Sequence, residues 1–303
     1  MEEIEDSCAD SHSQPWVEFL DNIAENYGPS NPQKDVLDIL RQTLFSSEEP
    51  SPIAAAQQID TYYQETYLLC DPLMRFQEDK GMGGFLHCLY ESVFDLVLRI
   101  PYNHTSQDIL VEFIAELRRL PPKQLKIWNE DVQIYTRDPI FASVMDDNWN
   151  GYFPSEDTSS SDIEKECIEW VNFSAFIARC TQSGLNDNFS HPCKYPSFDI
   201  PKGLEEEWLP GFRRSSLIRV AAQYILLAGS KLCEHWLEAS NTAKDRAVDR
   251  WKLWAKKLQE FSESKDLEMD LRTETLQAHD RIVALKPDLF RDSKDESKIG
   301  EAQ

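Results

Sequence analysis

The spacing of apolar residues is the feature that most constrains the fold of this chain. Over most of its length they recur every three to four positions, which is the period of one helix face. The segment 106–119 shows this best, with a stripe made of Ile109, Leu110, Phe113, Ile114 and Leu117. We find no convincing strand alternation. The sequence therefore predicts an all-α fold without significant sheet, either an irregular multi-helix bundle or an array of helical hairpins.

The same periodicity and the breakers between periodic segments predict where individual helices lie. Residues 85–100 are apolar nearly all round, so we expect this helix to be buried. Together with 106–119 across a short turn, it predicts an αα-hairpin. The full set of predicted helices covers residues 16–27, 32–45, 52–70, 85–100, 106–119, 163–180, 216–237, a segment around 248–258, and 270–285.

The distribution of polar residues predicts the domain organisation. We expect an acidic disordered N-terminus at 1–14, a single helical domain at 15–290, and a disordered polar tail at 291–303. Within the domain, 146–161 and 183–210 lack helical periodicity and are rich in turn-forming residues, so both are predicted to be irregular excursions. An irregular stretch as long as 183–210 is typical of a lid, a binding loop or a disordered segment.

The net charge excludes some classes of partner. The chain carries 54 acidic and 31 basic residues, for a formal net charge of −23. This charge repels nucleic acid backbones and anionic lipid surfaces, so we expect neither as a partner. Two basic clusters, Arg213 with Arg214 and Arg219, and Lys252 with Lys256 and Lys257, are predicted to be solvated helix faces.

The N-terminus and the cysteines indicate the compartment. The first ten residues are acidic and lack the basic and apolar regions of a signal peptide. The most apolar stretch, 217–237, is interrupted by charged residues, so it predicts a core helix and no membrane span. An odd number of cysteines, 7, also fits a disulfide framework poorly. We therefore expect a cytoplasmic or nuclear protein with reduced thiols, and one that is not secreted.

A family resemblance rests on several short motifs in a fixed order. They are Arg99-Ile100-Pro101-Tyr102, Gln107-Asp108-Ile109-Leu110-Val111, Leu117-Arg118-Arg119-Leu120-Pro121, Trp149-Asn150, the segment from Trp170 to Arg179, Ala221-Ala222-Gln223-Tyr224-Ile225, and Ala228-Gly229. Through them the chain resembles a fungal family of helical proteins, the domain of unknown function numbered 3632. The resemblance covers roughly residues 62–285 and implies a fungal intracellular protein. It implies no reaction for any residue.

Two motifs raise the possibility of an enzyme. Asp146-Asp147-Asn148-Trp149-Asn150 resembles the aspartate-rich magnesium motif of terpenoid cyclases, which are also all-helical, and Asn186-Asp187-Asn188 resembles the start of their second metal motif. Magnesium needs oxygen ligands that converge in near-octahedral geometry. Here both motifs are predicted to lie in loops, where such residues are common for conformational reasons. The sequence therefore favours a non-catalytic protein.

Metal, cofactor and nucleophile signatures are equally incomplete. His191 with Cys193, and Cys233 with His235, each bring two soft ligands together, but a structural zinc site needs four. We therefore expect no metal site and no cofactor. Five cysteines are predicted to be small buried apolar residues: Cys70, Cys88, Cys167, Cys180 and Cys233.

The candidate binding residues come from the first excursion and from the helix that follows it. Asn172 and Arg179 lie about two turns apart on a helix otherwise rich in aromatic residues and alanine. Such a pair is more often an internal hydrogen-bond network than a ligand site. If the chain has a pocket, we expect it to be lined by residues from the set Asp146, Asp147, Trp149, Asn150, Asn172 and Arg179.

Two functional hypotheses follow from the sequence. The first is a non-catalytic intracellular protein-interaction module that binds a protein partner through a helical groove or through the 183–210 excursion. The second is an all-helical enzyme or small-molecule binder with an apolar pocket. An apolar cavity with converging Asp, Asn or Arg favours the second, and a filled core with an exposed apolar groove favours the first.

Overall fold

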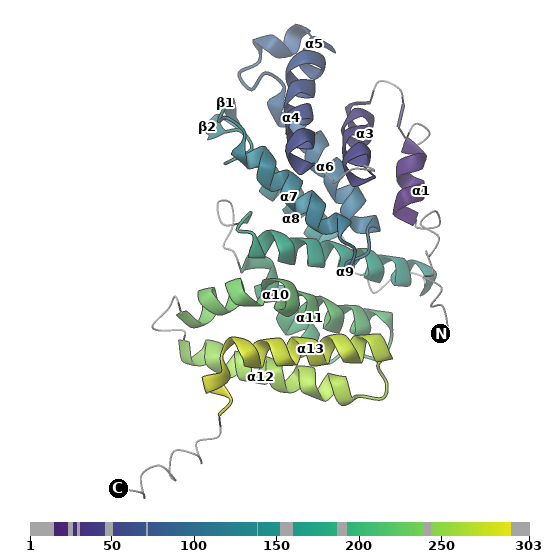
Figure 1. The fold of residues 1–303 in the computed structure, drawn as a ribbon, viewed down its shortest axis with the longest axis vertical. Coiled ribbons are helices and arrows are strands. Elements are labelled where there is room, and N and C mark those ends of the chain that lie inside the picture. The colour runs from purple at the N-terminus through teal and green to yellow at the C-terminus, as the bar shows by residue number, and fades with distance from the viewer. Residues whose placement is uncertain are drawn as a thin grey trace, which may run out of the picture. The chain divides into compact units, whose positions relative to one another are not determined.

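The fold is all-α, as the apolar periodicity predicts (Figure 1). The computed structural model describes residues 15–23, 27–28, 31–45, 51–70, 72–137, 139–151, 160–186, 193–238 and 244–291. The predicted N-terminal segment 1–14, and residues 292–303 of the predicted tail, lie outside the described residues. The chain divides into two compact units, Met1–Gly151 and Tyr152–Gln303, and each is described by itself. The prediction of a single domain stays a prediction.

Unit 1 is a group of helices followed by a small hairpin. Helix α4 packs against α7, while α6 packs against α8 and α3. The large buried side chains of α6 include Phe85, Leu89 and Phe94, in agreement with its apolar sequence. The described elements are α1 (Pro15–Asp21), α3 (Pro32–Leu44), α4 (Pro52–Tyr62), the π-helix η1 (Tyr63–Tyr67), α5 (Leu68–Cys70), the 3₁₀ helix η2 (Pro72–Phe76), α6 (Met82–Arg99), α7 (Ser106–Arg119), β1 (Gln124–Ile127), β2 (Glu130–Gln133) and α8 (Ile140–Gly151).

The starts of α3 and α4 follow the same local rule. The side chain of Asn31 accepts a hydrogen bond from the Gln33 backbone at 3.0 Å, and Ser51 accepts one from Ala54 at 3.3 Å. Each cap precedes a proline, which is tolerated at the first helical position because its missing N–H has no intrahelical partner there. These caps set the two helices that border the groove described below.

A two-stranded antiparallel hairpin lies where the helical pattern weakens. Strand β1 pairs with β2 from Gln124 opposite Gln133 to Ile127 opposite Glu130. Its turn residues, Trp128 and Asn129, both have positive φ, as a two-residue type I′ turn requires. This hairpin is not predicted from the sequence, because two four-residue strands are too short to show clear alternation.

The predicted αα-hairpin of 85–100 and 106–119 is wrong in its packing. Both helices form, as α6 and α7, and Gln107 caps the turn between them by donating to the Ile100 carbonyl at 3.0 Å. However, α7 packs mainly against α4 and α6 mainly against α8. A short connection permits antiparallel packing but does not require it. Here α7 packs against α4 instead.

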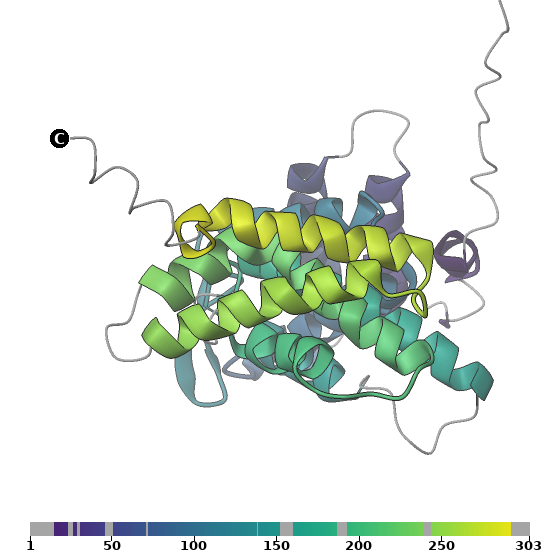
Figure 2. The ribbon, with the colours of Figure 1, turned by 90° about the horizontal axis from the view of Figure 1, so that it is seen from below.

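Unit 2 is built around α11, which packs against α9, α10 and α13. Helices α12 and α13 lie side by side in both views (Figures 1 and 2). The large buried side chains include Trp170, Phe176, Tyr224 and Trp251. The described elements are α9 (Ser160–Gln182), α10 (Lys194–Leu204), α11 (Phe212–Cys233), the π-helix η3 (Glu234–Glu238), α12 (Lys244–Glu263), α13 (Met269–Leu285) and the 3₁₀ helix η4 (Pro287–Leu289).

Helix α10 approaches α11 closely at a glycine. A Cβ at Gly203 would lie 2.3 Å from the carbonyl oxygen of Leu217, so only glycine fits there. One turn earlier, the fully buried Asp199 accepts a hydrogen bond from the Tyr224 hydroxyl at 3.1 Å. Burial, with the Asp199 charge as the next cause, raises the pKa of Tyr224 well above its usual value. The pair links α10 to α11 inside the core of unit 2.

Both predicted irregular excursions are wrong in part. Residues 146–151 continue α8, and 194–204 form α10; residues 152–159 and 187–192 lie outside the described residues. In α8 the turn-forming Asp146, Asp147 and Asn148 are held in a helix because Val144 and Met145 are buried. In α10 Pro196 lies in the first turn, where proline is tolerated. Tertiary burial has overridden local preference in both segments.

The prediction of a solvated arginine cluster is also wrong for two of its members, Arg214 and Arg219, because they form ion pairs. Arg214 pairs with Asp266, and Arg219 bridges to α13. The Nε atom of Arg219 lies 3.0 Å from Glu274 Oε2, and its guanidinium also contacts Asp270 at 2.6 Å. These contacts tie α11 to α13.

Candidate functional site

The predicted candidate residues fall in both units. Asp146, Asp147, Trp149 and Asn150 lie on α8 of unit 1, and Asp147 and Asn150 are exposed. Asn172 and Arg179 lie on α9 of unit 2; Asn172 is buried, and Arg179 reaches back to the Ala175 carbonyl at 3.4 Å. None of these residues lines either of the two pockets described below. Whether they bind a ligand stays a prediction.

A carboxylate cluster surrounds part of the predicted motif at the contact of α6 with α8. Burial is the main cause that raises the pKa of Glu91, and the charges of Asp95 and Asp147 act in the same direction. His87 and a hydrogen bond with Asn148 oppose the rise in pKa. Among the described residues, no group of three or more His, Cys, Asp or Glu side chains is arranged to hold a metal ion.

The second terpenoid-type motif is described only at its first residue. Asn186 lies just after α9 and donates to the Thr181 hydroxyl at 3.1 Å. This contact closes the end of α9, so the described part of the motif has a local structural role. Residues 187–190 lie outside the described residues.

The cysteines are mostly buried thiols. Cys167, Cys180 and Cys233 are buried as predicted, whereas Cys70 is exposed and the prediction for it is wrong. Cys88 is half-buried, and burial raises its thiol pKa to about 12. A thiol with that pKa is almost entirely protonated at neutral pH and is a poor nucleophile. Of the two pairs of soft ligands that the sequence brings together, His191 of the first lies outside the described residues.

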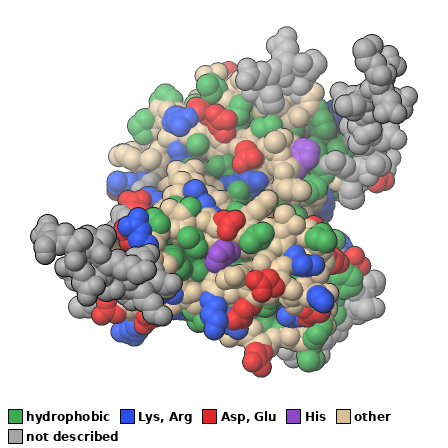
Figure 3. All heavy atoms as spheres, turned by 60° about the horizontal axis from the view of Figure 1, so that its bottom comes forward, with side chains coloured by type: hydrophobic (Ala, Val, Ile, Leu, Met, Phe, Trp, Pro, Cys, Tyr) green, Lys and Arg blue, Asp and Glu red, His purple; other side chains and the backbone are tan. Residues whose placement is uncertain are grey.

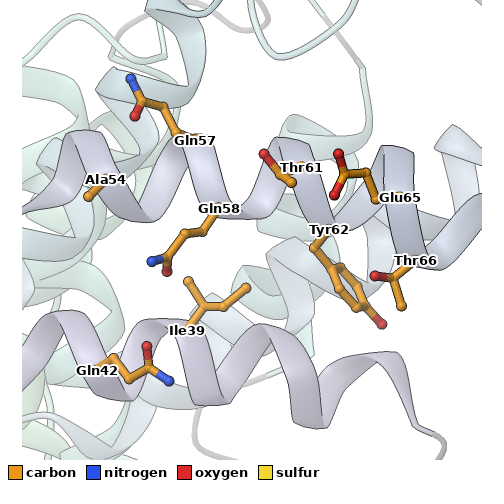
Figure 4. Close-up of a pocket in the computed structure, with 9 residues that line it drawn as sticks. All are labelled: Ile39, Gln42, Ala54, Gln57, Gln58, Thr61, Tyr62, Glu65 and Thr66. Atoms are coloured by element: carbon orange, nitrogen blue, oxygen red, sulfur yellow. The ribbon is translucent and has the colours of Figure 1, made fainter.

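Unit 1 has a groove of about 450 Å³ between α3 and α4 (Figure 4). Gln58 and Tyr62 point from α4 toward α3, where Ile39 and Gln42 face them. The Tyr62 hydroxyl donates to Asp35 at 2.9 Å, and burial raises the pKa of Tyr62. The remaining lining residues are Ala54, Gln57, Thr61, Glu65 and Thr66. Most of these lining side chains are polar, so the groove is a more polar site than the pocket of unit 2 described next.

Unit 2 has a smaller and more apolar pocket, of about 330 Å³, which we call the tryptophan pocket. Its lining residues are Ser197, Trp236, Arg246, Ala247, Arg250 and Trp254. Three elements supply them: α10 supplies the serine, η3 the first tryptophan, and α12 the other four. The π-helix η3 extends α11 with i to i+5 bonding, and such turns occur often at functional sites.

The two tryptophans form an edge-to-face pair inside this pocket. The ring centroids of Trp236 and Trp254 are 5.2 Å apart with an interplanar angle of 63°. Trp254 is 3% exposed and rests on the fully buried Trp251 at 6.1 Å. Trp236 is half-buried, so one of its faces contributes to the open pocket. Trp254 therefore supports Trp236 from within the fold, and Trp236 supplies the accessible aromatic surface of the pocket at little entropic cost.

The polar contacts of the pocket centre on Glu205, which follows α10. One carboxylate oxygen accepts hydrogen bonds from Trp254 Nε1 at 2.7 Å and from Arg250 Nε at 2.9 Å. The Arg250 guanidinium also lies over the Trp254 ring, 5.5 Å from its centroid. These contacts fix one tryptophan and one arginine in place before any ligand binds.

Arg246 lies one turn before Arg250 on α12 and is exposed. Within the described part of the chain it forms no hydrogen bond and no ion pair. On the face of the molecule shown in Figure 3, basic, acidic and apolar side chains are interspersed. The tryptophan pocket therefore combines an apolar wall with one fixed and one available guanidinium, and it is the best candidate functional site.

The residues of the tryptophan pocket are not among those predicted from the sequence to bind a ligand. A signal was present, because Arg246, Arg250 and Trp254 recur every four residues and so share one face of a helix. Trp236 and Ser197 come from other elements, and no local spacing relates them to α12.

An all-α protein of two helical units, with an aromatic pocket in the second, is the class that the structure defines. No helix in the described residues is both long and apolar enough to cross a bilayer. The chain belongs to a family described as protein of unknown function (DUF3632), whose model matches residues 90–258. This match confirms the resemblance found in the sequence. No curated protein and no solved structure gives a significant match to the chain.

Proposed function

We propose that this chain is a non-catalytic protein-interaction module of the cytosol or nucleus, and that the tryptophan pocket receives a large apolar side chain from a partner. The observation that carries the proposal is the Trp236–Trp254 pair beside two arginines. Tryptophan and arginine are the residues most enriched at the energetic centres of protein interfaces. A volume of about 330 Å³ suits one or two inserted side chains.

The surroundings of the pocket support an interface. Phe198, adjacent to the lining residue Ser197 on α10, is 56% exposed. The Arg250–Glu205–Trp254 contacts hold the wall in place, so binding would order few side chains. Preorganisation of this kind lowers the entropic cost of association.

The test is a quantitative affinity capture of the tagged full-length protein from its own cells, with cross-linking mass spectrometry at low and high salt. The variants are Trp236→Ala and the control Leu209→Ala, which removes a side chain that is 89% exposed and outside the pocket. We expect a stoichiometric partner that cross-links near α12. Trp236→Ala should weaken its capture by about 2 kcal/mol, roughly 30-fold, while the control retains it. A partner retained equally by both variants would contradict the proposal.

The apolar lining of the same pocket favours a second candidate, a small-molecule binder. Ligand pockets begin at about 300 Å³, and this pocket lies near that lower limit. A thermal-shift screen of metabolites would separate the two. A metabolite that raises Tm in the wild type and not in Trp236→Ala would favour this second function.

A further inference from the structure

The two arginines of the tryptophan pocket differ in their ion pairing, and this difference indicates the chemistry of the ligand. Glu205 neutralises Arg250, because its carboxylate accepts the Arg250 Nε hydrogen at 2.9 Å. Arg246, on the same face of α12, has no such partner within the described residues. Asp245 and Asp249 lie near it in sequence, yet neither forms an ion pair with it there. Within the described part of the chain, Arg246 therefore adds one unpaired positive charge to the lining of an apolar pocket.

The form of this charge favours a carboxylate over a phosphate. A single available guanidinium matches a single negative charge and can bind both oxygens of a carboxylate in a fork. Recognition of phosphorylated segments instead uses clusters of arginines. A long polyanion is disfavoured by the net charge of −23 on the chain. A short acidic segment can instead pair directly with Arg246, against the opposing charges of the exposed Asp245 and Asp249.

We infer that the tryptophan pocket binds a short acidic peptide segment of a partner protein. A large apolar side chain of the segment lies against Trp236, which Trp254 supports, and a neighbouring Asp or Glu carboxylate pairs with Arg246. Arg250 is a positioning residue that holds Trp254 through Glu205. The inference rests on the proposed function, since it names the chemistry of the ligand at the same site.

The test uses dye-labelled, end-blocked peptides and the full-length protein, with binding followed by fluorescence anisotropy. The acidic probe contains Asp-Phe-Asp, the neutral probe Asn-Phe-Asn, and the truncated probe Asp-Ala-Asp. We expect the acidic probe to bind at least tenfold more tightly than either of the others. Added salt should weaken the acidic probe more than the neutral one, because the ion pair is exposed and therefore screened.

Protein variants assign the preference to particular residues. Arg246→Gln should abolish the preference for Asp-Phe-Asp over Asn-Phe-Asn, while Lys252→Gln, which removes an exposed cation elsewhere on α12, should keep it. Trp236→Ala should weaken both probes. Far-UV circular dichroism confirms that each variant is folded.

The outcomes separate this inference from the proposed function. Equal binding of the acidic and neutral probes, lost in Trp236→Ala, would overturn the inference and leave the pocket as an interaction site. A preference that survives Arg246→Gln would overturn the role of Arg246. No binding of the acidic probe at millimolar concentration would also overturn the inference, while the capture experiment would still decide the proposed function independently. If 3-phenylpropionate binds as tightly as the acidic probe, the pocket is a site for small carboxylates, and the inference that its ligand is a peptide segment would be overturned.

Discussion

The indole nitrogen of Trp254 lies 2.7 Å from the carboxylate of Glu205, which also holds Arg250. This relationship joins the end of α10 to the middle of α12 and gives the tryptophan pocket its shape. Trp254 is almost fully buried, so its N–H needs an acceptor within the protein. Glu205 supplies that acceptor with a charged group, which makes a stronger bond than a neutral one.

Glu205→Gln should destabilise unit 2 by about 1 kcal/mol. A hydrogen bond to a charged group can contribute more than this, but solvent weakens the contact with Arg250 because the Arg250 side chain is partly exposed. Urea unfolding followed by circular dichroism would measure the loss. The control is Glu206→Gln, which changes an exposed neighbouring side chain and should leave the free energy of unfolding within about 0.5 kcal/mol of the wild type. Equal effects of the two variants would show that the Glu205 contacts contribute nothing specific.

Gly203→Ala should destabilise unit 2 by about 2 to 3 kcal/mol, because the added Cβ would overlap the backbone of Leu217. The helices must separate to relieve this overlap, so thermal unfolding should shift to lower temperature. Gly84→Ala is the matched control: its Cβ would lie 3.4 Å from the Tyr67 hydroxyl, an ordinary contact. In a helix this control should be neutral or stabilising by up to about 1 kcal/mol. A neutral Gly203→Ala would mean that α10 and α11 are less closely packed than described.

Glu91→Gln should stabilise unit 1 at neutral pH. Burial raises the pKa of Glu91 in the folded state above that in the unfolded state, so the folded state binds its proton more tightly. Stability therefore falls as pH rises from the unfolded pKa through the folded pKa. Glutamine cannot titrate, so the difference between variant and wild type should grow from pH 4 to pH 7, a range that spans the ordinary glutamate pKa of about 4.3.

Denaturant titrations of Glu91→Gln at several pH values would check this dependence. Glu112→Gln, an exposed glutamate on α7, is the control and should show no growing difference. A Glu91→Gln variant that is less stable than wild type at pH 7 would show that the charged carboxylate is favoured in the fold.

Arg219 and Glu274 should couple α11 to α13. Their side chains are 16% and 15% exposed and lie 3.0 Å apart. A double-mutant cycle with Arg219→Gln and Glu274→Gln should give a coupling of about 1 kcal/mol. The exposed pair Lys257–Glu260, at 3.1 Å, serves as the reference and should couple by no more than about 0.5 kcal/mol. Equal coupling in the two cycles would show that burial adds nothing to the Arg219 pair.

Sequence patterns predicted the helices well wherever an apolar stripe was long. The stripe of 106–119 became α7, with Leu110, Phe113, Ile114 and Leu117 buried. Prediction failed where turn-forming residues lay on buried helices, as with Asp146 and Asp147 on α8. Local preferences are worth tenths of a kcal/mol per residue, and burial of neighbouring apolar side chains outweighs them.

In the candidate site, too, some residues are related by sequence spacing and others only by tertiary packing. Arg246, Arg250 and Trp254 share a helix face by their spacing alone. Ser197, Glu205 and Trp236 reach the same pocket only because α10 and η3 pack beside α12. The spacing of apolar residues thus determined the all-α class and most helix positions, since helix formation depends on local periodicity. Tertiary structure decided which helices pair and where the pocket forms, because those depend on the match between faces far apart in the chain.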